Sequence, residues 1–150
     1  MSRLKTAASG SPPTPIFFNM LTIAPDAVGQ GTWARTVNTS ALYNALFANS
    51  TTADADEFSV NFYCPAGTYT IRFNALQSTN QGIVDIYLDG SEIDSQDLYA
   101  GSASYIYIHE ITGRVLTEGE HTLRFVIDGK NGSSSDFVFS TDGVTIQRTA

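Results

Sequence analysis

Residues 57–73 read EFSVNFYCPAGTYTIRF, and this stretch decides the fold. Phe58, Val60 and Phe62 alternate with more polar residues, and a similar alternation resumes after the turn at 65–67 (PAG). Because successive side chains of a β-strand point to opposite faces, this period of two predicts strands with one buried face and one wet face. Such half-buried strands belong to antiparallel sheets, since parallel strands covered on both sides read as continuous apolar runs.

The same alternation recurs downstream, in residues 69–74, 84–89 and 123–127. Turn dipeptides of the Asp-Gly and Asn-Gly type accompany these segments, and they supply the positive φ angles that tight hairpins need. These dipeptides stand at residues 89–90, 128–129, 131–132 and 142–143. Residues 39–48 (TSALYNALFA) carry i, i+4 apolar pairs that fit either a short helix or a strand, and we expect a strand. The pattern predicts an all-β fold, a two-sheet antiparallel β-sandwich of jelly-roll type.

The composition fits one such domain. The chain has 150 residues, which is close to the usual size of one domain. Charged residues make up 15% of the chain, against about 25% in an average globular protein. This composition suits strands with polar but uncharged outer faces, as in extracellular or virion-surface sandwiches. Cys64 is the single cysteine, so an internal disulfide is excluded, and its inward position in the alternation predicts a core residue.

An extended N-terminal arm, residues 1–27, is predicted to precede the β-sandwich domain, residues 28–150. Residues 1–15 (MSRLKTAASGSPPTP) have almost nothing to bury, and their prolines favour an extended conformation. The segment 16–24 (IFFNMLTIA) is interrupted by Asn19, and we interpret it as a strand or docking segment rather than a secretion signal. The candidate partner-binding residues of the arm are Arg3, Lys5, Pro12, Pro13, Pro15, Phe17 and Phe18.

The charge is unevenly distributed along the chain. Residues 1–25 contain Arg3 and Lys5 and no acid, so their net charge is +2. The remaining residues have a net charge of −9, which gives −7 for the whole chain. An acidic body disfavours nucleic acid and anionic membranes as partners, because both require a basic footprint. No segment reaches the roughly 20 apolar residues that span a bilayer. The basic arm is either solvated or docked on an acidic partner.

No residue pattern points to catalysis. His109 is followed by Glu110, but a zinc HExxH site needs a second histidine at position 113, which is Gly113. His121 stands at a predicted strand start, where a surface or cross-strand role is more common. We therefore predict a non-enzymatic protein without a cofactor or metal. The acidic residues around one predicted hairpin could bind calcium, which prefers oxygen ligands, but we favour the interpretation that they are solvated turn residues. These residues are Asp85, Asp89, Glu92, Asp94 and Asp97.

Aromatic residues on polar strand faces are the candidates for a ligand or interface surface. If Ile106 and Ile108 face inward, Tyr105 and Tyr107 flank one solvent-exposed face, where tyrosine stacks on sugar rings or anchors protein interfaces. With the opposite parity, the same tyrosines fill the core. The lone tryptophan suits a core or subunit contact better than a sugar platform. The candidate residues are Trp33, Tyr63, Tyr87, Tyr105 and Tyr107.

Four segments carry a resemblance to known proteins: AGTYTIRFNA at 66–75, VDIYLDGSEI at 84–93, LTEGEHTLRFVIDGKN at 116–131 and DGVTI at 142–146. They resemble carbohydrate-binding-module-like jelly-roll domains, including those found in tailed-phage virion proteins. The resemblance covers about half of the chain, from residue 65 to residue 145. It implies the fold more strongly than the ligand, because one fold hosts many functions.

The resemblance and the arm together suggest two functions. A small free-standing sandwich with an extended arm is similar in architecture to a phage capsid decoration (cement) protein. This similarity implies a homo-oligomer, dimer or trimer, on the capsid exterior, bound to the major capsid protein or another virion protein. The alternative is a carbohydrate-binding or host-receptor-binding module of a phage fibre or tail, with a glycan as ligand. Binding to shells or to glycans distinguishes the two.

Overall fold

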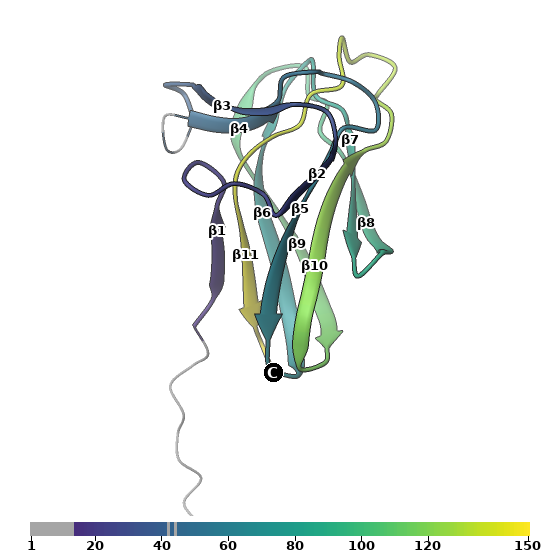
Figure 1. Ribbon diagram of the computed structural model, residues 1–150. Helices are drawn as coiled ribbons and strands as arrows, with labels where there is room; N and C mark the ends of the chain where they lie inside the picture. The colour runs from purple at the N-terminus through teal and green to yellow at the C-terminus, as the bar shows by residue number, and fades with distance from the viewer. Residues whose placement is uncertain (1–13, 42, 44) are drawn as a thin grey trace, which may run out of the picture.

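The computed structural model describes residues 14–41, 43 and 45–150. The described chain contains eleven β-strands and no helix, and the strands form two sheets that pack face to face (Figure 1). Neighbouring strands are antiparallel throughout both sheets. The predicted all-β, two-sheet antiparallel sandwich is confirmed.

The first sheet, sheet A, has six strands. They are β1 (Ile16–Asn19), β3 (Trp33–Val37), β4 (Ala45–Asn49), β6 (Gly67–Gln77), β9 (Ser104–Leu116) and β11 (Ser140–Arg148). Their order across the sheet is β3-β4-β11-β6-β9, and β1 also pairs with β11. Strands far apart in the sequence are therefore neighbours, because the last strand lies between β4 and β6.

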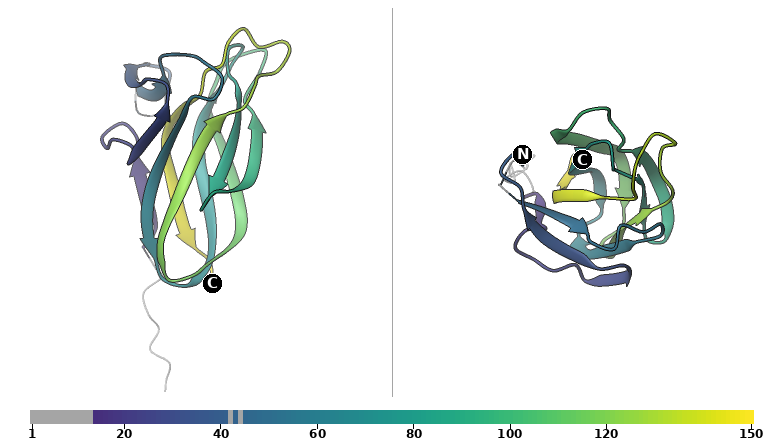
Figure 2. Two further views of the ribbon diagram at one scale, coloured as in Figure 1. Left: turned by 45° about the vertical axis from the view of Figure 1, so that its right-hand side comes forward. Right: turned by 90° about the horizontal axis from the view of Figure 1, so that it is seen from above.

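The second sheet, sheet B, has five strands in the order β2-β5-β10-β7-β8. They are β2 (Ala27–Gln30), β5 (Glu57–Cys64), β7 (Ile83–Leu88), β8 (Ser91–Asp97) and β10 (Gly119–Ile127). The turned views in Figure 2 show the two layers of strands from the side and from above. Each sheet consequently has one face toward the core and one outer face.

The core between the sheets follows the alternation that the sequence predicts. The four inward residues of the 57–64 segment are buried: Phe58, Val60, Phe62 and Cys64. Phe58 stacks on Phe125 at 5.2 Å between ring centroids, and Phe73 meets Phe125 edge to face at 5.5 Å. Each such aromatic pair contributes about 0.5–1.5 kcal/mol beyond the area that it buries. The first pair packs side by side within sheet B, and the second joins β6 of sheet A to β10 of sheet B.

The segment predicted to be an arm contributes a strand to the sandwich. β1 pairs with β11, and its residues Ile16 and Phe18 pack against the core cluster. Burial of these two apolar side chains explains why the chain is ordered into a strand before the predicted domain boundary at residue 28. Four predicted arm contacts lie outside the described residues: Arg3, Lys5, Pro12 and Pro13.

The ambiguous segment 39–48 ends in a strand. β4 begins at Ala45, and it pairs with both β3 and β11. Phe47 points into the core, while Leu46 packs into a separate small cluster with Ala41 and Leu76. Burial on both faces explains why this strand lacks the clear alternation of its neighbours.

Candidate ligand-binding face

Three neighbouring strands of sheet A, β11, β6 and β9, present a polar outer face. On β6, Ile71 and Phe73 are buried in the core, so the residues that alternate with them point outward. The same reasoning applies to β11, where Val144 and Ile146 are buried. The outward residues are Thr70 and Arg72 of β6, Thr145 and Gln147 of β11, and Glu110 of β9.

These outward side chains stand in register across the sheet. Arg72 pairs with Thr145 on one side and with Glu110 on the other, and Gln147 pairs with Thr70 in the next row. They line a shallow hollow of about 280 Å³. That volume is near the lower end of small-molecule sites, which begin at about 300 Å³. The lining residues are Thr70, Arg72, Glu110, Thr145, Gln147 and Thr149.

Two of the residues that line this hollow form an ion pair. The Arg72 guanidinium donates to the Glu110 carboxylate, and their side chains remain 51% and 43% exposed. An exposed pair of this kind contributes only about 0–1 kcal/mol to stability, because water solvates both partners in the unfolded chain. The two groups nevertheless present several donors and acceptors side by side. The hollow is thus suited to a ligand rich in hydroxyl groups.

On β9, Ile106 and Ile108 face outward and the tyrosines that alternate with them face inward, the reverse of the arrangement that would make a tyrosine surface. Ile106 and Ile108 are 58% and 49% exposed, so the assumption that they face inward is wrong. Tyr107 packs against the core cluster, and its hydroxyl donates to Oε1 of Gln96 on β8 at 3.1 Å. Tyr105 is half-buried and packs on the small cluster that contains Leu46. Neither tyrosine belongs to the polar outer face.

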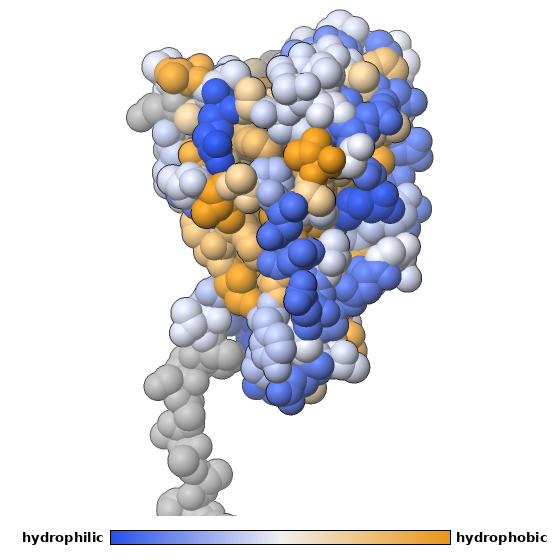
Figure 3. All heavy atoms as spheres, viewed as in Figure 1, coloured by the Kyte–Doolittle hydropathy of each residue, from blue (hydrophilic) through white to orange (hydrophobic). Residues whose placement is uncertain are grey.

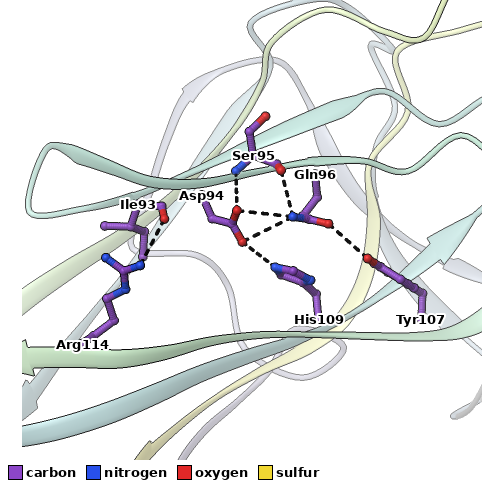
Figure 4. A network of polar contacts seen from close by, with 7 residues as sticks. All are labelled: Ile93, Asp94, Ser95, Gln96, Tyr107, His109 and Arg114. Atoms are coloured by element: carbon purple, nitrogen blue, oxygen red, sulfur yellow. Dashed lines mark hydrogen bonds and ion pairs between the residues drawn. The ribbon is translucent and has the colours of Figure 1, made fainter.

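A polar network connects the edge strands β8 and β9 across the gap between the sheets (Figure 4). His109 contacts the Asp94 carboxylate through Nε2 at 2.5 Å, and its ring packs near Phe73. Arg114 donates to the backbone carbonyl of Ile93 at 3.4 Å. The His109 ring is thus held between Asp94 of β8 and Phe73 of β6.

His121 also has structural partners. Its ring lies 2.7 Å from the Asp89 carboxylate and 3.0 Å from the Thr117 carbonyl. Burial alone would lower the pKa of His121, but these two hydrogen bonds outweigh it and raise the pKa above its ordinary value. The pKa of Asp89 is lowered: burial opposes this change, and the hydrogen bonds from His121 and from the Thr122 amide exceed it. This pair anchors the turn between β7 and β8.

Two other predicted aromatic residues lie on the outer face of sheet B. Tyr63 is 62% exposed and its hydroxyl donates to Glu118 at 3.0 Å. Tyr87 lies under the Arg124 guanidinium, 4.4 Å from the ring centroid. The pKa of Tyr87 is raised, first by burial and then by the negative charges of Glu92 and Asp85. The two tyrosines are separated along the strands, since Tyr63 is level with Glu120 and Tyr87 with Arg124.

Trp33 and the two phenylalanines of β1 occupy different environments. Trp33 packs on Phe47 and Phe58 at ring distances of 5.4 and 4.7 Å, consistent with the predicted core contact. Phe18 is half-buried against the core, whereas Phe17 is 51% exposed on the outer face of sheet A. The five aromatic candidates Trp33, Tyr63, Tyr87, Tyr105 and Tyr107 thus form no single surface. Pro15, also predicted to contact a partner, is exposed just before β1.

Three of the five acids around the β7–β8 hairpin bind different side chains. Asp89 binds His121, Asp94 binds His109, and Asp97 accepts from Asn131 at 2.7 Å. In the part of the chain that the structure describes, no three acidic, histidine or cysteine side chains converge to hold a metal ion. Within the same residues there is no helix that qualifies as a membrane span.

Comparisons with known proteins agree on the fold. No protein-family model matches the chain. Over 61 residues, 41% of this chain, it is 41% identical to an A type blood alpha-D-galactosamine galactosaminidase from Flavonifractor plautii, and it covers 6% of that protein. Among solved structures, it is similar to a Paenibacillus xanthan lyase (TM-score 0.75, 22% identity), covering 96% of this chain and 14% of that one.

Isolated carbohydrate-binding modules are also similar along nearly their whole length. The CBM36-1 domain of a xylanase from the hindgut metagenome of Trinervitermes trinervoides matches with a TM-score of 0.67 and 16% identity, covering 91% of this chain and 99% of that domain. A family 35 module from Clostridium thermocellum matches with a TM-score of 0.55 and 18% identity, covering 88% and 98%. At these identities the likeness establishes the jelly-roll fold that carbohydrate-binding modules share. These neighbours lend no support to a capsid decoration protein.

One similar structure is described as a CBM36 module in complex with calcium and xylotriose, at a TM-score of 0.61 and 14% identity, covering 90% of this chain and all of that one. At 14% identity, the likeness to this calcium-bound module shows the fold alone.

Proposed function

We propose that this chain is a non-catalytic carbohydrate-binding module that holds a glycan in the hollow on the outer face of sheet A. The observation that carries this proposal is the exposed Arg72–Glu110 pair, flanked by threonine hydroxyls in the same hollow. Sugar hydroxyls both donate and accept hydrogen bonds, and this lining offers both kinds of partner side by side. The fold shared with carbohydrate-binding modules supports the same function.

The charges favour a neutral glycan. Glu110 balances the positive charge of Arg72 within the hollow, and the chain as a whole carries −7. A polyanionic glycan would require an excess of basic side chains at its binding site. A neutral polysaccharide or oligosaccharide meets no such requirement.

The same lining argues for binding without hydrolysis. Most glycoside hydrolases place two carboxyl groups on either side of the scissile bond. The hollow is lined by a single carboxyl group, that of Glu110, and Arg72 already pairs with it. The two histidines are engaged elsewhere, with Asp94 and Asp89.

Sheet B offers a matched control for the binding test. On its outer face Arg124 pairs with Glu57 at 2.7 Å, so each sheet carries one arginine–glutamate pair. The test compares the double variant Arg72→Met/Glu110→Gln with the control Arg124→Met/Glu57→Gln. Neither double variant changes the net charge.

Binding is measured by affinity gel electrophoresis with xylan, glucomannan, arabinoxylan and galactan, and by calorimetry with soluble oligosaccharides. We expect the wild-type chain to be retarded by at least one of these glycans, the sheet A variant to lose at least tenfold in affinity, and the sheet B variant to bind as the wild type does. Absence of wild-type binding to every glycan would refute the proposed function. Equal losses in both double variants would place the ligand elsewhere.

A further inference from the structure

We propose, on the basis of the glycan site above, that Phe17 is a platform for a second sugar unit, so that the site recognises an oligosaccharide lying across the strands. Phe17 is the outward residue of β1, because Ile16 and Phe18 on either side of it pack against the core. Its side chain is 51% exposed. The ring therefore faces the same side of sheet A as the polar hollow.

The strand register brings Phe17 next to the hollow. Phe17 is the direct partner of Thr145 on β11, and Thr145 is one of the residues that line the hollow. Across the sheet the same row continues through Arg72 to Glu110. An aromatic ring, a hydroxyl, a guanidinium and a carboxylate thus follow one another on four neighbouring strands.

A glycine on β11, next to the end of the hollow at Thr145, makes room for the Phe17 ring. A Cβ atom added to Gly143 would stand 2.9 Å from Cε2 and 3.1 Å from Cζ of Phe17, closer than side chains tolerate. The ring therefore lies on the bare backbone of β11, one strand nearer to the hollow than its own strand. Any larger residue at position 143 would displace it.

Exposure of one phenylalanine is unremarkable by itself, since isolated apolar side chains are common on protein surfaces. Here the exposed ring is continuous with a polar site, and the next row of the sheet runs from Gly143 through Asn74 to Ile108, which is 49% exposed. The Phe17 ring and Ile108 thus stand at the two ends of the sheet on the same side of the hydrogen-bonding row, while Gln147 and Thr70 lie on its other side. Figure 3 shows apolar surface gathered along the side of the molecule where β1 lies.

The distance between β1 and β9 is larger than one sugar unit. β1 and β9 are three strand spacings apart, about 14 Å. A sugar hydrogen-bonded to Arg72 and Glu110 lies over β6 and β9, and it leaves Phe17 free for the next unit along the chain. Pyranose rings present C–H groups on one face, and aromatic rings bind such apolar surface while the ring hydroxyls reach polar neighbours. Phe17 should therefore add affinity only when the ligand is longer than one unit.

The test measures how affinity depends on ligand length. Calorimetry compares xylose with xylotriose, glucose with cellotriose, and mannose with mannotriose, for the wild type, Phe17→Ala and Phe17→Trp. The control is Val28→Ala, which truncates an apolar residue of similar exposure (46%) on β2 of sheet B. Circular dichroism and melting temperature show that each variant remains folded.

For the bound trisaccharide we expect Phe17→Ala to lower affinity about tenfold, Phe17→Trp to keep it, and Val28→Ala to leave it unchanged. Affinity for the matching monosaccharide should be the same in all four proteins. Gly143→Ala should also lower trisaccharide affinity, because its Cβ would displace the Phe17 ring, and it would press on the Phe18 carbonyl of β1 as well, so its melting temperature is compared with that of the wild type. The platform is excluded if Phe17→Ala binds the trisaccharide as tightly as the wild type while Arg72→Met/Glu110→Gln does not, and the proposed function then stands. If the wild type binds none of the six sugars and none of the four polysaccharides, both proposals fail; if it binds a polysaccharide, the same comparison is made with the trisaccharide of that polymer.

Discussion

The outer faces of sheets A and B carry the same kind of ion pair in different surroundings. On sheet A, the side chains of Arg72 and Glu110 are 51% and 43% exposed. On sheet B, those of Arg124 and Glu57 are 37% and 23% exposed, and Arg124 also covers the Tyr87 ring at 4.4 Å. The guanidinium on sheet B is therefore occupied by its neighbours, whereas the one on sheet A faces a hollow. The same two residue types therefore do not make equivalent sites. What differs is how many of their hydrogen-bonding groups remain accessible to a ligand.

The two sheets also place a carboxyl group in different environments. Asp142 of sheet A is 2% exposed, and neither of its carboxyl oxygens makes a well-formed hydrogen bond among the described residues, although the Asn74 side chain is nearby. Asp89, at the β7–β8 turn of sheet B, accepts hydrogen bonds from His121 and from the Thr122 amide. Burial raises the pKa of Asp142, although Asn74 partly opposes this change, whereas the pKa of Asp89 is lowered. Folding stability should therefore respond to these two acids in opposite directions.

The largest stability effect is expected at Asp142. Its pKa is raised in the folded protein, so the folded state favours the protonated carboxyl: stability is greatest below about 3.8, the ordinary pKa, and declines as pH rises through the folded-state pKa. Asp142→Asn removes this decline and should add about 1–3 kcal/mol to the free energy of unfolding at neutral pH, the usual range for relieving an unsatisfied buried group. Urea denaturation at pH 7.5 and pH 3.5 checks it, and the gain should vanish at the acidic pH.

A loss of stability in Asp142→Asn at neutral pH would contradict this account. Such a loss would mean that the carboxylate has a stabilising partner beyond the side chains that surround it. Thr141→Ser, at the neighbouring buried position, is a suitable control, because its hydroxyl still reaches the Asn74 carbonyl, which lies 2.6 Å from the Thr141 hydroxyl.

The intermediate effect is the pH dependence of the His121–Asp89 pair. The raised pKa of His121 gives stability that is complete below about 6.5 and is lost as pH rises through the folded-state pKa. The lowered pKa of Asp89 gives stability that is present above about 3.8 and is lost as pH falls through its folded-state pKa. The pair therefore contributes most between these two limits.

Asp89→Asn tests the pair with little change in the backbone. Asp89 has a φ of 51°, and asparagine tolerates this left-handed conformation. We expect the variant to lose stability at pH 6, by about 1 kcal/mol for the weakened hydrogen bonds, and to show a flatter decline between pH 6 and pH 8 than the wild type. Thermal unfolding across that range measures both. An unchanged slope would show that His121 does not titrate through this contact.

The core and the sheets could be predicted from the sequence because they depend on local alternation. Phe58, Val60 and Phe73 are inward by the period of two, and the structure buries them. On β9 the same rule failed, since isoleucine and tyrosine are both good strand residues and the pattern has two valid parities. In the structure Tyr107 faces the other sheet, where it packs against the core cluster and donates its hydroxyl proton to Gln96 on β8. A contact between two different sheets leaves no trace in the local pattern.

The candidate site could not be predicted for a related reason. Its lining comes from β6, β9 and β11, which are neighbours only through the strand order of sheet A. Thr70, Arg72 and Glu110 each read as ordinary outward residues of separate strands. The sequence does show that the outward residues of these strands are polar and mostly uncharged. It does not show which of them are neighbours, because that depends on the register between strands. Phe17 is predicted as a partner contact of the arm, in a segment interpreted as a strand or docking segment, and the structure shows a strand there.

The smallest expected effect separates the two arginines by stability rather than binding. Arg124→Met removes the ion pair with Glu57 and the contact with the Tyr87 ring, each worth about 0.5–1 kcal/mol at a partly exposed site. Methionine still covers part of the ring, so we expect a loss below about 1 kcal/mol. Arg72→Met should change the free energy of unfolding by less than that, because its single ion pair is the more exposed one. Urea denaturation of both variants in parallel, at low and high salt, measures the difference. A larger loss for Arg72→Met than for Arg124→Met would mean that the sheet A pair is structural, and it would remove the reason for regarding that pair as available to a ligand.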